Sequence, residues 1–174
     1  EAWAFGTGSR NVIVAVIDSG VDYNHPDLAA NMWVNDGEIP GNGIDDDGNG
    51  YIDDVQGFDF YNYDADPMDD NGHGTHCAGT VGAVGFNGTG VIGVAPGVRI
   101  MPVKFLGADG GGWLSQAIRA IEYAVNNGAS VLSNSWGGGG YLQGLYDAIE
   151  MARQHGVIFI AAAGNYSSDN DQKP

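Results

Sequence analysis

The sequence predicts an α/β fold with a doubly wound, mostly parallel sheet flanked by helices. Four runs of apolar and largely β-branched residues, at 11–17, 98–106, 130–135 and 157–163, are typical of strands buried on both faces of a parallel sheet. Helical patterns separate the later runs, and such strand–helix–strand connections build parallel sheets with right-handed crossovers. The 174 residues suffice for a sizeable core, so we expect one domain over the whole chain.

Two helices are predicted in the second half of the chain. Apolar residues at helical spacing run from Leu114 to Ala124, and the Asn-Asn-Gly sequence at 126–128 ends that helix. The same spacing runs from Leu142 to Ala152. Earlier in the chain, small residues from His73 to Ala83 predict a tightly packed, buried helix, and Val55–Phe60 predicts a short strand.

Several polar residues are expected at one edge of the sheet. Predicted strands end at Asp18, at Ser135–Gly137 and at Gly164-Asn165, and parallel strands share their carboxyl edge, where open α/β sheets bind ligands. His73 opens a helix, where a histidine is suited to acid–base work. An aspartate, a histidine and an amide donor in one place indicate a nucleophilic hydrolase.

The composition excludes some partners. The chain carries 22 acidic residues against 6 Lys and Arg, a net charge of −16, which argues against nucleic acid and anionic membrane surfaces as partners. No apolar run reaches the roughly 18 residues that span a bilayer. The single cysteine cannot form an internal disulfide.

The segment 36–70 is unusually acidic and predicts a calcium site. It holds twelve acidic residues and no Lys or Arg, and its sequence from 45 to 50, DDDGNG, fits the opening of a calcium loop. An EF-hand would place a glutamate where Gln56 stands, so a lone Ca²⁺ loop is expected; a solvated acidic loop is the alternative. The expected oxygen donors are Asp45, Asp47, Asn49 and the Tyr51 carbonyl.

Four segments together resemble the subtilisin-like serine proteases, or subtilases. They are the aspartate motif AVIDSG at 15–20, the histidine motif NGHGTHCAGT at 71–80, the cleft segment SWGG at 135–138 and the oxyanion segment AAAGN at 161–165. Asp18 precedes His73 along the chain, which is the order of subtilisin. The resemblance implies a subtilisin-like fold, endopeptidase activity on polypeptides, bound Ca²⁺ and secretion.

The resemblance also implies roles for individual residues. Asp18 would orient the imidazole, His73 would act as general base and then general acid, and Asn165 would donate its amide to the oxyanion. His76 would be structural, packed beneath the site. The substrate would bind as an added strand along Gly110, Gly111, Gly112, Ser135, Trp136 and Gly137, with Ala162, Ala163 and Gly164 forming another wall.

Two further features follow from the family pattern. A second family calcium site would comprise Asp27, Gly85, Asn87, Thr89 and Val91. Cys77 places the chain near the subtilases that carry a thiol beside the histidine, although a buried small apolar residue is the simpler interpretation of a lone cysteine.

One departure from the family is expected to decide activity. The nucleophilic serine of subtilases lies in a GTSMA segment after the oxyanion asparagine, and these 174 residues contain no such segment. The chain is therefore interpreted as the amino-terminal part of a catalytic domain, inactive alone and completed by the missing carboxyl-terminal part. The alternatives are a calcium-binding pseudoprotease and a metal-dependent hydrolase using Asp18, His73 and His76.

Overall fold

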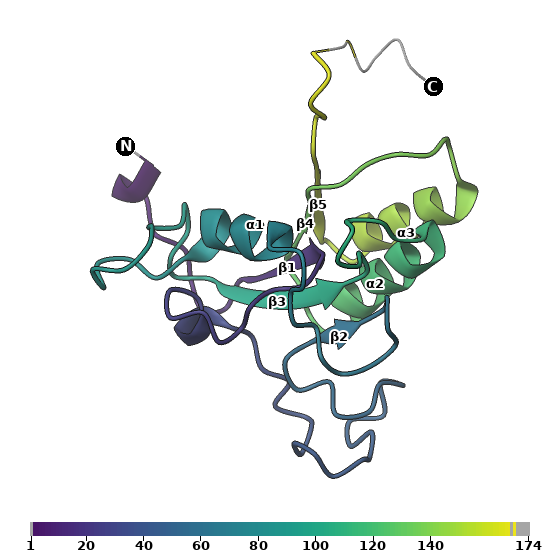
Figure 1. The fold of residues 1–174 in the computed structure, drawn as a ribbon, viewed down its shortest axis with the longest axis horizontal. Coiled ribbons are helices and arrows are strands. Elements are labelled where there is room, and N and C mark those ends of the chain that lie inside the picture. Colours follow the sequence, from purple (N-terminus) through teal and green to yellow (C-terminus); the bar gives the residue numbers. More distant parts are fainter. Residues whose placement is uncertain (1, 168, 170–174) are drawn as a thin grey trace.

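The structure, a computed structural model, describes residues 2–167 and 169 and confirms the predicted α/β fold (Figure 1). Five parallel strands form one sheet in the order β2-β3-β1-β4-β5. Their bounds are β1 Ile13–Asp18, β2 Phe58–Asp59, β3 Arg99–Lys104, β4 Val131–Asn134 and β5 Ile158–Ala161. Each predicted strand is present, and β1 at the centre is buried along its whole length.

Helices cover both faces of the sheet, as a doubly wound fold requires (Figure 1). Helix α1 (His73–Gly82) packs on one face, and helices α2 (Leu114–Asn126) and α3 (Gln143–Gln154) pack on the other. Alternation along β1 explains the two layers, because Val14 and Val16 join the core under α1 while Ala15 and Ile17 join the core under α2. Two short 3-10 turns, Ala2–Ala4 and Ala29–Asn31, complete the regular structure of the described residues.

The glycine after His73 lets α1 approach the end of β1. A Cβ on Gly74 would collide with the Gly20 carbonyl oxygen and lie 3.2 Å from the Asp18 side chain. Only glycine permits this approach without displacing backbone. The packing therefore brings the first residue of α1 beside the last residue of β1.

The outer face of α1 differs from the sequence prediction. Only Gly74, Ala78 and Gly82 of this helix are buried, while His76 is exposed. The helix is therefore buried along one side only, and the prediction that His76 is packed beneath the site is wrong for this structure. The reason is that the main contacts of α1 with the regular elements of the described residues are those with β1 and β3, on one side of the helix.

The last strand is also exposed. Ile158 and Ile160 of β5 are 57% and 52% exposed, and β5 pairs with β4 alone. Strands of parallel sheets are normally covered on both faces, so β5 offers an apolar surface and an unpaired backbone edge. Among the described residues, no helix is long and apolar enough to cross a membrane.

Candidate active site

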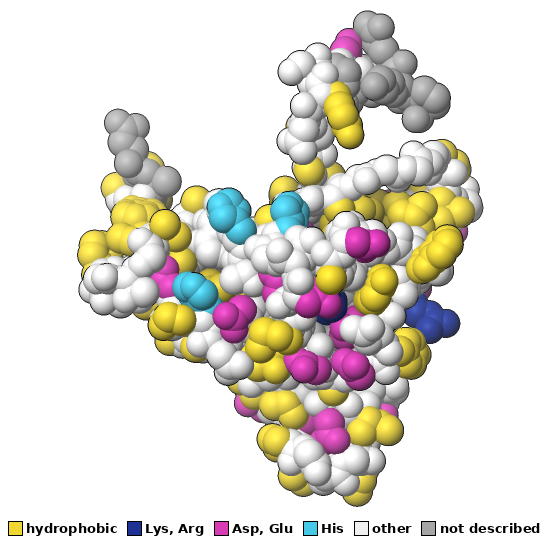
Figure 2. Space-filling model, viewed as in Figure 1, with side chains coloured by type: hydrophobic (Ala, Val, Ile, Leu, Met, Phe, Trp, Pro, Cys, Tyr) yellow, Lys and Arg dark blue, Asp and Glu magenta, His cyan; other side chains and the backbone are white. Residues whose placement is uncertain are grey.

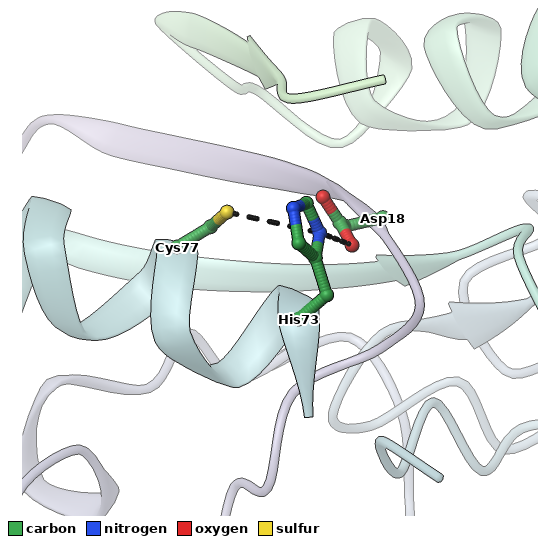
Figure 3. Close-up of side chains that lie close together, drawn as sticks. All are labelled: Asp18, His73 and Cys77. Carbon is green, nitrogen blue, oxygen red and sulfur yellow. Dashed lines mark hydrogen bonds and ion pairs between the residues drawn. The ribbon is translucent and has the colours of Figure 1, made fainter. Parts of the chain in front are cut away.

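Asp18 and His73 are in direct contact, as the sequence predicted (Figure 3). The Nδ1 atom of His73 lies 2.7 Å from Oδ1 of Asp18. Asp18 is completely buried, whereas the His73 side chain is 50% exposed. A carboxylate accepts a hydrogen bond, so this contact favours the tautomer that carries its proton on Nδ1 and leaves Nε2 free to take up a proton.

The carboxylate of Asp69 fixes the loop that leads into α1. Its Oδ1 accepts hydrogen bonds from the Ser19 hydroxyl at 2.9 Å and from the Gly72 N–H at 2.9 Å, and its Oδ2 accepts from the N–H and hydroxyl of Thr75. Burial alone would raise the pKa of the Asp69 carboxyl, but these hydrogen bonds outweigh burial and hold the pKa below its usual range. The ionised carboxylate therefore joins the ends of β1 and α1.

A cleft extends from the Asp18–His73 pair. Its first part, 270 Å³, is lined by both residues together with Leu106, Gly110 and Ser135–Gly137. A second part, 370 Å³, continues between Gly110–Gly112 and the segment from Trp136 to Gly139. The structure thus brings together the two glycine-rich segments that were predicted to hold an extended substrate, and Trp113 also lines the second part.

The thiol of Cys77 lies one helical turn from His73. Its Sγ is 3.9 Å from the His73 Nδ1, the nitrogen that already contacts Asp18 (Figure 3). Burial raises the pKa of the Cys77 thiol, and a hydrogen bond with Ser135 only partly offsets this effect. Because a reactive cysteine needs a lowered pKa, the geometry does not make Cys77 a substitute nucleophile.

The oxyanion segment lies after β5. The Ala162 N–H donates to the Asn134 carbonyl oxygen at 3.0 Å, which continues the pairing with β4. Ala162, Ala163, Gly164 and Asn165 are exposed, and the chain leaves the sheet here (Figure 1). The structure does not bring Asn165 into the lining of the cleft, so its role and that of the preceding wall stay predictions.

The predicted calcium loop folds around clustered carboxylates. Oxygens of Asp45 and Asp47 lie within 4.8 Å of each other and of a Glu38 oxygen. The Asn49 N–H donates to both aspartates, at 3.0 and 2.9 Å, which gives the loop its tight curvature. The three carboxylates present hard oxygen donors of the kind Ca²⁺ prefers, so the residues fit the ion. In the view of Figure 2, acidic side chains are spread over the visible face of the molecule, and few Lys or Arg side chains lie among them.

The second predicted calcium site is partly assembled. Asp27 is 2% exposed; its Oδ1 accepts from the Asn87 amide at 2.7 Å and its Oδ2 from the Val91 N–H at 2.9 Å. The Asn87 hydrogen bond, followed by that of Val91, lowers the pKa of Asp27. The structure brings these three residues together, while no hydrogen bond found in the described part of the chain joins Gly85 or Thr89 to Asp27, and calcium here stays a prediction.

The sequence comparison places the chain in a family. The sequence profile of the subtilase family matches residues 9–174. The chain belongs to the subtilase family. It is 41% identical to subtilisin-like protease 1 of Plasmodium vivax over 162 residues, and this alignment covers 92% of this chain and 26% of that protein. It is 38% identical to thermitase of Thermoactinomyces vulgaris over 165 residues, and this alignment covers 95% of this chain and 51% of thermitase.

A solved structure agrees with this subtilase assignment. The crystal structure of a cold adapted subtilisin-like serine proteinase superposes with a TM-score of 0.67 at 33% identity, covering 90% of this chain and 48% of that one. Membership supports serine peptidase chemistry at the level of the family, and it confirms the resemblance drawn from the four motifs. This subtilase chain spans about half the length, or less, of the relatives named here.

Some site residues were not predicted from the sequence. Glu38 lies seven residues before the calcium motif, and only the folded loop brings it close to Asp45. Its place in the acidic segment 36–70 was the one feature of the sequence that could have suggested it as a ligand. Leu106 lines the cleft, although the sequence predicted it to be the last residue of a buried strand. His76, the third ligand in the metal-hydrolase alternative, belongs to no carboxylate–histidine–cysteine cluster among the described residues.

Proposed function

We propose that the protein is a secreted serine endopeptidase that cleaves polypeptides with an Asp/His/Ser triad, whose serine lies in a segment outside these 174 residues. One observation carries the proposal: the 2.7 Å contact between the buried Asp18 carboxylate and the half-exposed His73. The pair would supply two members of a catalytic triad, the general base and the carboxylate that orients it, and it lines a cleft with two glycine-rich walls.

The proposed mechanism assigns one task to each residue. His73 takes the proton of the serine hydroxyl as the hydroxyl attacks the scissile carbonyl, and then gives that proton to the leaving amine. Asp18 holds the imidazole in the required orientation and stabilises its charged form. The Asn165 amide donates a hydrogen bond to the oxyanion of the tetrahedral intermediate.

The partner proposed for this chain is the carboxyl-terminal part of the same catalytic domain. Two surfaces support this pairing: the unpaired apolar edge of β5 and the exposed outer face of α1. A groove of 510 Å³ runs along that outer face, between His76, Thr80 and the loop from Gly90 to Val94. The relatives, in which this chain accounts for about half the length or less, support it further.

A peptidase assay tests the proposed function. The complete protein is expected to hydrolyse a fluorogenic peptide and to react with a serine-directed fluorophosphonate, whereas residues 1–174 alone should do neither. An Asp18→Asn variant of the complete protein should keep its fold and lose most turnover. A complete protein that binds calcium but neither turns over peptide nor reacts with the probe would support the pseudoprotease alternative instead.

Asn165 is expected to act only on the transition state. Asn165→Ala in the complete protein should lower kcat by about 10²–10³-fold with little change in KM, a magnitude borrowed from subtilisin. Steady-state kinetics on one peptide series separates the two constants. A change confined to KM would assign Asn165 to ground-state binding and contradict the oxyanion role.

The cleft should favour large apolar or aromatic side chains. Trp136 and Gly137 form one wall, and Ala162 to Gly164 are expected to form the other, so neither wall carries a charged side chain that could bind a cation. Apolar slots discriminate weakly between residues that differ by a methylene. Peptide-library profiling should therefore show a broad apolar preference; a strict requirement for Lys or Arg at the cleaved bond would refute this prediction.

A further inference from the structure

We infer that Lys104 is a positioning residue for the Asp18–His73 pair, because its buried ammonium group joins the three chain segments that build the cleft. This inference rests on the proposed function. Lys104 is the last residue of β3 and lies opposite Asp18 in the register of β3 and β1. It is 1% exposed and is the only buried cationic side chain in the described part of the protein.

The ammonium group of Lys104 uses all of its hydrogen-bonding capacity. It donates to the Ser19 carbonyl oxygen at 2.7 Å, to the Leu106 carbonyl oxygen at 3.0 Å and to Oδ1 of Asp70 at 2.6 Å. An ammonium has three N–H donors, and each has its own acceptor here. The three bonds therefore restrain the cation from three directions.

Each acceptor belongs to a different part of the site. Ser19 directly follows Asp18 at the end of β1, and Asp70 lies three residues before His73 in the loop that opens α1. Leu106 lines the cleft together with Ser19 and His73. Movement of the cation would thus shift the Asp18 backbone, the His73 loop and the cleft wall relative to one another.

Stability alone is a weak reason for this buried cation. Among the described residues, the one carboxylate in direct contact with the ammonium group is that of Asp70, which is 48% exposed. The buried Asp59 carboxyl lies opposite Lys104 in the register of β2 and β3 and interacts with its charge. Replacing a buried ion pair by an apolar side chain of similar size is often neutral or stabilising. What an apolar side chain cannot supply is a set of directional, charge-assisted bonds to three segments. Asp69 ties β1 to α1 through Ser19, and Lys104 adds β3 to that assembly.

Kinetics on the complete protease test the inference. Lys104→Met keeps the length of the side chain and removes its donors, and we expect kcat to fall about tenfold to a hundredfold, the size that small misplacements of reacting groups produce. KM should stay within about twofold of the parent value. The matched control is Met101→Ala, which truncates a buried residue of the same strand on the opposite face of the sheet.

Proton NMR gives a second readout that does not depend on turnover. The low-field resonance of the proton between His73 Nδ1 and Asp18 should shift or broaden in Lys104→Met and remain unchanged in Met101→Ala. If Lys104→Met does not fold, Asp70→Asn takes its place, since that variant alters a half-exposed carboxylate; it should lower kcat a few-fold and shift the same resonance.

Three results would overturn the inference. The first is a folded Lys104→Met enzyme with parental kcat and resonance; the second is an increase in KM alone; the third is an equal loss of kcat in Met101→Ala at the same melting temperature. A parent protein without peptidase activity would instead refute the proposed function, and the resonance would still decide whether Lys104 positions the pair.

Discussion

Replacing His73 by alanine in the complete protease is expected to lower kcat by about 10⁶-fold, a magnitude borrowed from the loss of the histidine in subtilisin. The imidazole is the only base near the buried Asp18 carboxylate among the described residues, and Asp18 itself has no exposed surface from which to reach a substrate. Without His73, the serine hydroxyl has no proton acceptor. Single-turnover kinetics with an activated ester measures the loss directly.

His76→Ala is the matched control for this experiment. His76 lies three residues further along α1, and its side chain is exposed rather than directed into the Asp18 pair. We expect kcat of His76→Ala to stay within about tenfold of the parent value. The main effect should be a lower melting temperature, because the complete domain is expected to cover the outer face of α1. Parental activity in His73→Ala, or equal losses in both variants, would contradict the assignment of His73 as the base.

The predictable part of this site follows from the local sequence. Asp18 ends a strand that is apolar at every position and His73 opens a helix of small residues, so their positions are set by the ends of two elements. Parallel packing then brings the carboxyl edge of the sheet and the mouth of the helix together. The 2.7 Å contact between Asp18 and His73 could therefore be anticipated, because it depends only on the ends of β1 and α1.

The unpredicted part depends on contacts between distant residues. Lys104 reaches Asp70, 34 residues away, and Asp54 accepts hydrogen bonds from Tyr123, 69 residues away, and from Asn35. Local periodicity carries no information on such pairs. The exposure of His76 was likewise unpredictable, because small residues indicate close packing on some side of a helix without showing which sides are covered.

Removing calcium is expected to lower the melting temperature of the protein, and the clustered carboxylates give the reason. Oxygens of Glu38, Asp45 and Asp47 lie within 4.8 Å of one another. Two like charges at this separation repel by roughly 3 kcal/mol at an effective dielectric constant of about 20. Hydrogen bonds from backbone N–H groups offset part of this repulsion, and a divalent cation would reverse its sign.

The stabilisation expected from bound calcium follows from the linkage between ligand binding and folding. A ligand that binds only the folded state stabilises it by RT ln(1 + [L]/Kd), about 2.7 kcal/mol at a hundredfold excess over Kd and about 4.1 kcal/mol at a thousandfold excess. Thermal melts in calcium and in EGTA measure this difference. Chelation should also expose the segment 36–70 to proteolysis, because its fold depends on carboxylates that then repel one another.

Asp47→Ala should reproduce part of the loss caused by EGTA and should weaken the response to calcium. Asp36→Ala is the matched control, since Asp36 is an exposed acidic residue of the same segment that lies outside the cluster. Both variants remove one negative charge from the segment, so a general effect of charge would stabilise them equally without calcium. A specific site predicts instead that only Asp47→Ala loses the calcium-dependent shift; if calcium moves none of the melts, the loop is a solvated acidic surface.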